Sequence, residues 1–298
     1  MPQSIPWDPH LLARVETLEW RSRVLVNGFL QGLHRSPMRG FSSEFSQYRP
    51  YYPGDELKRL DWRAYGRLDR LYVREYEAET NLRCQILVDA SGSMGYRSAN
   101  TPFRKYDYAA LLAAALIRLL QTQRDACGLT LMQTGVFEYL PPKLSKAHFT
   151  RCLAAFEALA PKGGSDLLAT VNHLVNLFPH RGLVAIFSDA WEDPDRISSA
   201  LERLLFDKHD ICFFQIVDPR ELDFKFSESR MFRDMETGLR VPVTPEWTRA
   251  KYLNAVAKHL DALKQKCLDI GVVYRVLTTT QPPFETFAAF MAERERRL

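Results

Sequence analysis

The chain has 298 residues, of which 46% are hydrophobic and 26% are charged, and its mean hydropathy is -0.26. These values are typical of a folded globular protein and exclude the collagen-like, low-complexity and coiled-coil classes. No stretch reaches the roughly 18 consecutive apolar residues that a membrane helix needs. The first residues also lack the basic and apolar regions of a signal peptide. We therefore expect a cytoplasmic protein.

The net charge of +4, from 40 basic and 36 acidic residues, is concentrated near the amino terminus. Residues 35–74 carry nine basic and five acidic side chains, and this difference of +4 equals the excess of the whole chain. Tyrosines and Trp62 lie between these charges, so one alternative is a nucleic-acid-binding module in which arginine binds phosphate and tyrosine stacks on bases. The interleaved acidic residues favour intramolecular ion pairs instead.

The predicted elements begin with an amphipathic helix over residues 11–30. The aromatic and basic segment 35–80 follows, and we expect it to fold as β-hairpins on the main domain because its tyrosines are too apolar to remain in water. From residue 82 onward, short β-rich runs alternate with helical patterns, which is typical of a doubly wound, mainly parallel sheet in an α/β domain. The predicted parts are thus an amino-terminal helix (1–34), a β module (35–80) and an α/β domain with carboxyl-terminal helices (81–298).

Six strands are predicted in the α/β domain. Only Gln133, Thr134 and Gly135 separate the second strand from the third, which is too short for a crossover, so these two strands should form an antiparallel hairpin at one sheet edge. Ser145 and Ser165 are candidate helix caps, and Gly271 is a candidate left-handed residue at a helix end. The predicted strands are 82–88, 127–132, 136–140, 183–187, 211–217 and 272–277, and the predicted helices are 106–123, 146–160, 166–178, 195–208, 245–269 and 284–297.

Five cysteines are scattered through the chain without any C-x-x-C pair. Their odd number and their spacing argue against a disulfide framework and against a thiolate zinc site. We predict that they are reduced core residues: Cys84, Cys127, Cys152, Cys212 and Cys267.

Oxygen-bearing side chains gather in three loops that follow strands or precede helices. Asp89, Ser91 and Ser93 alternate directly after the first predicted strand, Ser165 precedes a helix in a Gly-Gly-Ser-Asp loop, and Asp189 follows the strand 183–187. In a doubly wound sheet, loops at the carboxyl ends of the strands form the ligand crevice. These hard oxygen donors could therefore converge on one cation.

The pattern resembles the metal-ion-dependent adhesion site of the von Willebrand factor A-like fold, in which D-x-S-x-S is followed by a threonine loop and by a later aspartate. Asp89, Ser91, Ser93 and Asp189 match, while Ser165 stands where the family usually has threonine and keeps the hydroxyl. The resemblance implies a Mg²⁺ or Mn²⁺ site with one position open to a ligand's carboxylate. Asp166 is then a candidate for holding a metal-bound water or a ligand hydroxyl.

Motifs in the segment before the sheet point to one family within this fold. It reads Arg35-Ser36-Pro37-Met38-Arg39-Gly40, then Arg49-Pro50-Tyr51, Pro53-Gly54-Asp55 and Leu60-Asp61-Trp62-Arg63, and Val217-Asp218-Pro219 with Glu221 follows later. Together these motifs resemble domain-of-unknown-function family 58, over nearly the whole chain. Members of that family are commonly encoded beside MoxR-type AAA+ ATPases, which implies that such an ATPase is the partner.

Less specific interpretations compete with the metal site. Asp89 could cap the following helix, and Ser91 and Ser93 could bond nearby backbone. A hydrolase with Ser93 or Asp89 as nucleophile is a further alternative, but Ser91 replaces the first glycine of a G-x-S-x-G elbow. The candidate bases are His209, directly after the predicted helix 195–208, and His259, within the predicted helix 245–269, rather than residues of loops above the sheet.

We therefore predict a non-catalytic adaptor that binds a protein partner through the metal. The partner would donate an Asp or Glu carboxylate to the open coordination position, so chelation would release it. No membrane contact is expected.

Overall fold

The computed structural model describes residues 9–35, 48–50, 72–74, 82–284, 286–287 and 291. The chain divides into two units, Met1–Phe29 with Leu82–Leu298, and Leu30–Asn81. In the second unit, β1 (Tyr48–Pro50) pairs antiparallel with β2 (Tyr72–Arg74). The remainder of the predicted β module at 35–80 lies outside the described residues, as does most of the predicted helix 284–297.

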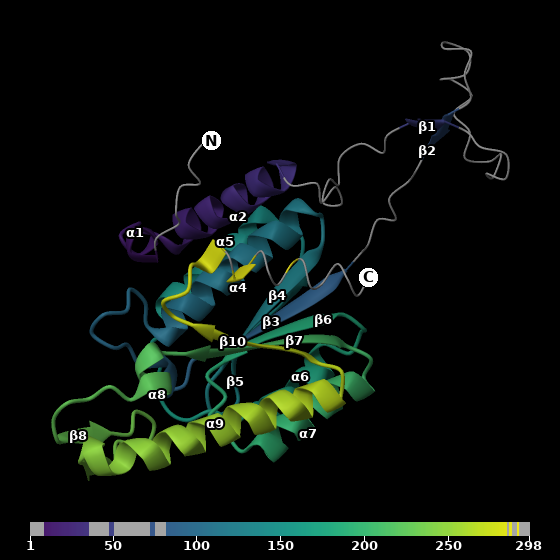
Figure 1. Ribbon diagram of the computed structural model, residues 1–298. Coiled ribbons are helices and arrows are strands. Elements are labelled where there is room, and N and C mark those ends of the chain that lie inside the picture. Colours follow the sequence, from purple (N-terminus) through teal and green to yellow (C-terminus); the bar gives the residue numbers. More distant parts are fainter. Residues whose placement is uncertain are drawn as a thin grey trace. The chain divides into compact units, whose positions relative to one another are not determined.

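The first unit is built on a six-stranded sheet in the order β10-β7-β6-β3-β4-β5 (Figure 1). All neighbouring pairs are parallel except β4 and β5, which pair antiparallel at the edge of the sheet as predicted. The mainly parallel α/β class expected from the sequence is therefore confirmed. The strands are β3 (Arg83–Asp89), β4 (Ala126–Met132), β5 (Val136–Lys143), β6 (Leu183–Ser188), β7 (Asp210–Val217) and β10 (Val273–Thr278).

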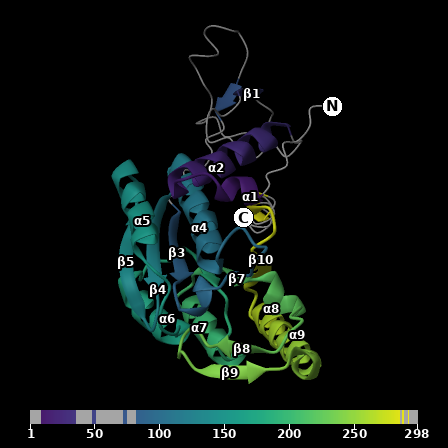
Figure 2. The ribbon, with the colours of Figure 1, turned by 90° about the vertical axis from the view of Figure 1, so that its left-hand side faces the viewer.

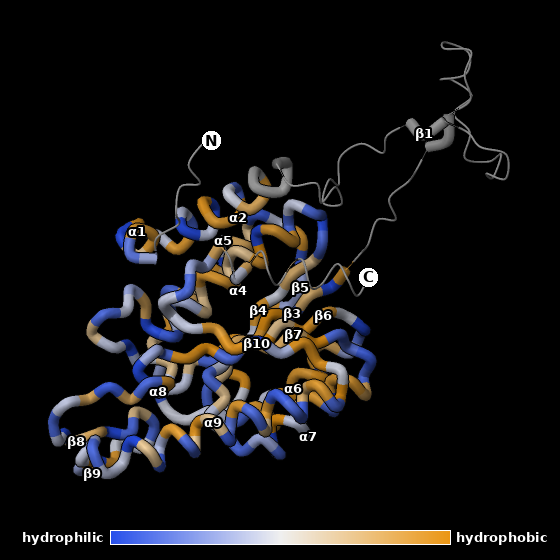
Figure 3. Tube along the Cα trace, in the orientation of Figure 1, coloured by the Kyte–Doolittle hydropathy of each residue, from blue (hydrophilic) through white to orange (hydrophobic). Residues whose placement is uncertain are grey.

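Helices cover both faces of this sheet. α4 (Lys105–Thr122) and α5 (Lys146–Ala158) lie on one face, whereas α6 (Leu167–Leu177), α7 (Pro194–Phe206) and α9 (Pro245–Asp269) lie on the other (Figures 1 and 2). Figure 3 shows the strands as mostly hydrophobic, because strands covered on both faces need apolar side chains in both directions. All five cysteines are free and buried, as predicted.

The amino-terminal helix differs from its prediction, because two helices occupy the region expected to form one. α1 (Pro9–Ala13) ends, and α2 (Leu18–Arg35) begins after a turn. Arg21 stabilises the break, since its guanidinium donates to the carbonyl oxygens of Val15 at 2.7 Å and Ala13 at 2.9 Å. These carbonyls lie at the end of α1, where helical partners are missing.

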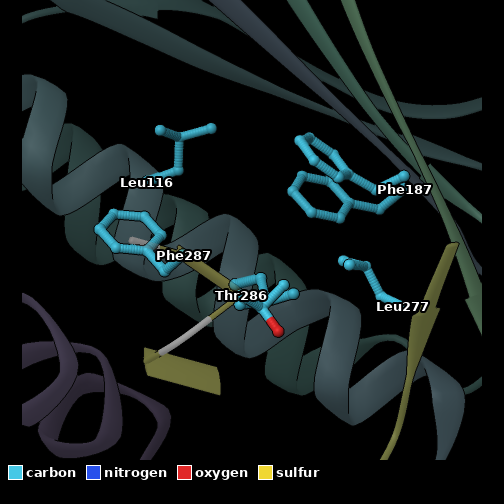
Figure 4. A pocket seen from close by; sticks show the side chains of 7 residues that line it. Leu116, Phe187, Leu277, Thr286 and Phe287 are labelled. Carbon is cyan, nitrogen blue, oxygen red and sulfur yellow. The ribbon is translucent and has the colours of Figure 1, made fainter. Parts of the chain in front are cut away.

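α4 is the central helix of the fold, with its side chains buried almost all round. Such a helix must be covered on both sides, and α2 supplies the second cover: Glu19 Oε1 accepts from Arg118 at 3.3 Å, and Arg21 lies over the Phe103 ring. Beside α4, a small apolar pocket faces the sheet (Figure 4). Phe187, Leu277 and Phe287 are among its lining residues.

α9 (Pro245–Asp269) has the predicted boundaries, and a glycine follows its carboxyl-terminal end as predicted. Gly271 follows the helix with a φ of +74°, which glycine adopts at little cost because it lacks a Cβ atom. Three elements were not predicted: α8 (Pro219–Asp223) and the antiparallel hairpin of β8 (Arg230–Arg233) and β9 (Arg240–Val243). They connect β7 to α9.

Among the described residues, no helix combines the length and the apolar character needed to cross a lipid bilayer.

Candidate metal centre

The candidate site lies where the strand order reverses. From β3 the chain proceeds outward through β4 and β5, and then returns to place β6 on the other side of β3. β3 and β6 are parallel, with Val88 opposite Phe187, so Asp89 and Ser188 come at the same edge of the sheet. A crevice at the carboxyl ends of strands forms at such a switch point, because the following helices pass to opposite faces.

Asp89 is fully buried at this edge. Its Oδ1 accepts from the backbone N–H of Ser91 at 2.8 Å, and its Oδ2 accepts from the Ser188 hydroxyl at 2.6 Å. Burial, together with the negative charge of Asp189, raises the pKa of the Asp89 carboxyl to about 7, although the hydrogen bonds from Ser188 and Ser91 oppose the change. The two carboxylates therefore lie close enough for the charge of one to affect the other.

Ser91 and Ser93 follow Asp89 in the loop that leads into a short 3-10 turn, η2 (Ser93–Gly95). Their hydroxyl oxygens are 3.1 Å apart. The alternation brings both hydroxyls to the same side of the loop, beside the Asp89 carboxylate. The D-x-S-x-S pattern thus folds as a compact cluster of oxygen atoms.

The Ser165 loop is bound to this cluster through the backbone. Gly92 N–H donates to the carbonyl of Gly163 at 2.7 Å, and Lys162 N–H donates to the carbonyl of Ala90 at 3.0 Å. The Ser165 hydroxyl donates to Glu192 Oε1 at 2.9 Å. The Ser165 loop therefore reaches the Asp89 loop, and Glu192 is a neighbour that the sequence analysis did not identify.

The predicted cap of α6 is wrong by one residue. Asp166, rather than Ser165, caps the helix, with its Oδ1 accepting from Ala169 N–H at 2.9 Å. Its other oxygen pairs with Arg196 at 2.7 Å. Both oxygens of Asp166 thus have partners in α6 and α7, and Glu192 accepts the N–H of Leu167 instead.

Asp189 is held in place by an unusual backbone. Ala190, directly after it, has a φ of +52°, a conformation that costs a non-glycine residue about 1–2 kcal/mol. Three hydrogen bonds maintain it: Ala190 N–H to the Ser188 hydroxyl, Gln215 to the Asp189 carbonyl, and the His259 ring to the Ala190 carbonyl. Backbone strain of this kind persists only where the surroundings enforce it, and it is concentrated at functional sites.

Lys105 is the main residue that the sequence analysis missed. Its ammonium group is fully buried and lies 2.8 Å from Asp189 Oδ2 and 2.6 Å from Glu221 Oε1. Burial alone lowers the pKa of Lys105, but Asp189 and Glu221 outweigh it and raise the pKa above its usual value. Burial raises the pKa of Glu221 although Lys105 opposes this. The only hint in the sequence is a lysine at the start of an otherwise apolar helix.

Glu236, in the turn of the β8–β9 hairpin, is the other missed neighbour. Its Oε1 accepts from the Ser93 hydroxyl at 3.0 Å. Burial raises the pKa of Glu236, and the charges of Asp189, Asp234 and Glu192 raise it further against the Ser93 hydrogen bond. Five carboxylates thus lie at or next to this edge of the sheet: Asp89, Asp189, Glu192, Glu221 and Glu236. Lys105 pairs with Asp189 and Glu221, and Arg196 acts on Glu192.

This donor set suits Mg²⁺ or Mn²⁺, which prefer carboxylate, hydroxyl and water oxygens. Within the described ranges, no three His, Cys, Asp or Glu side chains are grouped as a conventional metal centre. The predicted site does not require one, because three of its five members are serines. Asp189 also bonds Lys105 through Oδ2 alone, so a water bound to the metal could be held by its other oxygen.

The serine form of the hydrolase alternative expects a histidine beside Ser93, and among the described residues no histidine is hydrogen-bonded to the Ser93 hydroxyl. The hydrogen bonds of the Ser93 hydroxyl go to Ser91 and Glu236. His209 precedes β7 and so lies at the opposite edge of the sheet from Asp89. His259 is in α9, and its Nε2 is 2.7 Å from the Ala190 carbonyl oxygen. Neither histidine is hydrogen-bonded to Ser93.

One family model matches most of the chain. The family model described as Protein of unknown function DUF58 matches residues 47–262. The chain belongs to this family. The match includes Asp89, Ser91, Ser93, Ser165 and Asp189 within its range.

The chain is similar to mycobacterial proteins and, more weakly, to several solved structures. The chain is 26% identical over 299 residues to the Mycobacterium tuberculosis protein named Uncharacterized protein Rv1480, covering 97% of this chain and 91% of that one. An aerotolerance-related membrane protein from Bacteroides fragilis is 14% identical with a TM-score of 0.47, covering 72% of this chain and 99% of the other. The SpRpn10 VWA domain is 13% identical with a TM-score of 0.38, covering 68% and 92% respectively.

Proposed function

We propose that this protein is a metal-dependent protein-binding adaptor of the cytoplasm. Asp89, Ser91, Ser93, Ser165 and Asp189 hold one Mg²⁺ or Mn²⁺ ion at the junction of β3 and β6. A partner protein donates an aspartate or glutamate carboxylate to this ion. The observation that carries the proposal is the convergence of two buried aspartates, from adjacent parallel strands, with the paired hydroxyls of one loop.

Each side chain has a distinct task in this proposal. The hydroxyls of Ser91 and Ser93 bind directly, whereas Asp89 and Asp189 orient bound water and supply negative charge. The dication itself provides the charge that attracts a carboxylate. Lys105 fixes the rotamer of Asp189 through their 2.8 Å ion pair, and Gln215 fixes its backbone. The site is therefore rigid before a partner arrives, which reduces the entropic cost of association.

The partner class follows from the family resemblance described above. We propose a MoxR-type AAA+ ATPase, for which the chain would act as an adaptor in the maturation of proteins or complexes. Five buried free cysteines fit a reducing compartment. Catalysis is not part of the proposal, since Ser93 has no histidine base in the described structure.

The test combines metal binding with partner capture. Calorimetry with MgCl₂ and MnCl₂ should show one site in the wild-type protein and none in Asp89→Asn. The control Asp210→Asn removes a charge from an exposed residue at the start of β7, on the opposite edge of the same sheet, and should bind like wild type. Tagged protein incubated with the purified ATPase should retain it with Mg²⁺ and lose it with chelator.

Two results would contradict the proposal. Equal metal binding by wild type and Asp89→Asn would exclude the site. Equal retention of the ATPase by both proteins, with or without chelator, would exclude metal-mediated adhesion.

A further inference from the structure

The β8–β9 hairpin lies beside the amino-terminal part of α9 (Figures 1 and 2), and its turn contacts the loop of the candidate metal centre at Gly92. Its turn is held by its own hydrogen bonds. Asp234 N–H donates to the Leu239 carbonyl at 2.8 Å, and Asp234 Oδ1 accepts from Glu236 N–H at 2.9 Å. The turn therefore presents Glu236 in a defined direction rather than on a loose loop.

The turn contacts two of the three loops of the centre. Met235 lies against the Asp89–Ser93 loop so closely that a Cβ atom on Gly92 would be 2.2 Å from the Met235 carbonyl oxygen. A Cβ atom on Gly164, in the Ser165 loop, would be 3.4 Å from Glu236 Oε2. Glycine at position 92 thus permits a backbone approach that no other residue would allow.

Glu236 itself touches a proposed ligand of the metal. Its Oε1 accepts from the Ser93 hydroxyl at 3.0 Å, and the negative charges of Asp189, Asp234 and Glu192 act on it. A carboxylate held among like charges gains little from a neutral hydroxyl alone. A dication beside Ser93 would supply the missing attraction, because it would be shared by Asp189 and Glu236.

We propose that Glu236 is the chain's own carboxylate ligand for the metal, so that the hairpin closes the centre and competes with a partner's carboxylate. This inference rests on the proposed function. It adds an internal ligand to that site: in the absence of a partner, Glu236 occupies the position at which a partner would bind. The partner must displace the hairpin turn, and association is gated by the opening of residues 234–239.

The experiment measures Mn²⁺ binding alone, by calorimetry, in the wild type, Glu236→Gln and Glu236→Ala. Glu228→Gln is the matched control, because it removes the same charge from an exposed residue just before β8. Loss of a ligand interaction should weaken Mn²⁺ affinity by about tenfold or more in both Glu236 variants, and Glu228→Gln should bind like wild type. Excess acetate should restore affinity in Glu236→Ala, where it can enter the vacated position, and should not change binding by the wild type.

Hydrogen exchange provides a second measurement. Mn²⁺ should slow exchange of residues 230–243 in the wild type and leave it unchanged in Glu236→Gln. Equal or tighter Mn²⁺ binding by Glu236→Gln, with wild-type binding intact, would overturn this inference and leave the proposed function standing. Absence of Mn²⁺ binding by the wild type would overturn both.

Discussion

Removal of the Lys105 ammonium group is expected to destabilise the fold strongly. Lys105 is 0% exposed, and its partners Asp189 and Glu221 are 2% and 17% exposed. Loss of one member of a buried ion pair costs about 3–5 kcal/mol, because the remaining charge stays buried without compensation. Lys105→Met keeps the length and the apolar stem, so the cost should come from charge rather than from a cavity.

The magnitude can be measured as a melting temperature. Domains of 150–250 residues lose roughly 2–4 °C per kcal/mol, so Lys105→Met should lower Tm by about 6–20 °C in a circular-dichroism melt. Arg104→Gln is the matched control. It breaks a neighbouring ion pair, with Asp107, whose side chains are 46% and 32% exposed, and exposed pairs contribute about 0–1 kcal/mol.

A charge-neutral variant separates electrostatics from packing. Lys105→Met combined with Asp189→Asn and Glu221→Gln removes the three charges together and should recover much of the lost Tm, because neither former partner of Lys105 keeps an unpaired buried charge. If Lys105→Met melts no lower than Arg104→Gln, or if the triple variant melts lower than Lys105→Met, the reasoning from buried charge is refuted.

Four further predictions address the site and the fold. Gly92→Ala should speed hydrogen exchange in residues 230–243, because its Cβ would meet the Met235 carbonyl at 2.2 Å; unchanged exchange would contradict the close packing. Ser145→Ala should lower the free energy of unfolding by about 1 kcal/mol in urea, since it removes the cap that accepts from His148 N–H; Thr150→Ala, within the same helix, is the comparison. Burial lowers the pKa of His148 from 6.5, so the neutral ring contributes fully to the free energy of unfolding above pH 6.5, and this contribution is lost as the pH falls towards the lower pKa of the folded state. Urea titrations at several pH values should therefore show a smaller loss of stability in acid for His148→Gln than for the wild type. Parallel curves for the two proteins would argue against this role. Chelation should lower the Tm of the metal-loaded wild type but not of Asp89→Asn, since a ligand of the folded state alone stabilises it; a drop in both would indicate chelator binding elsewhere.

Local sequence patterns predicted most of the sheet and its helices. Apolar runs predicted the six strands of the main sheet, and the three-residue link before Val136 predicted the antiparallel edge. Pro245 and Gly271 marked the ends of α9 because proline suits a first helical turn and glycine suits a left-handed residue. Such signals depend on conformational preferences of neighbouring residues, so they can be read without the tertiary fold.

Part of the candidate metal site could also be predicted from local sequence patterns. Asp89, Ser91 and Ser93 lie in a five-residue pattern, and strand endings placed Asp189 at the same sheet edge. The break between α1 and α2 was missed because it depends on Arg21, whose guanidinium reaches back to α1 from the next helix. The hydrophobic periodicity of the sequence does not predict the hydrogen bonds between Arg21 and the end of α1.

The sequence by itself therefore determined the succession along the chain of the six main-sheet strands and the helices that cover them, and the small loop rich in oxygen donors. Only the tertiary structure decided which charges surround that loop. Lys105 meets Asp189 across 84 residues, and Ser93 meets Glu236 across 143 residues. These pairs form because parallel strands bring their carboxyl ends to one edge and a later hairpin folds back over it, whereas the preferences of each residue extend over only a few neighbours.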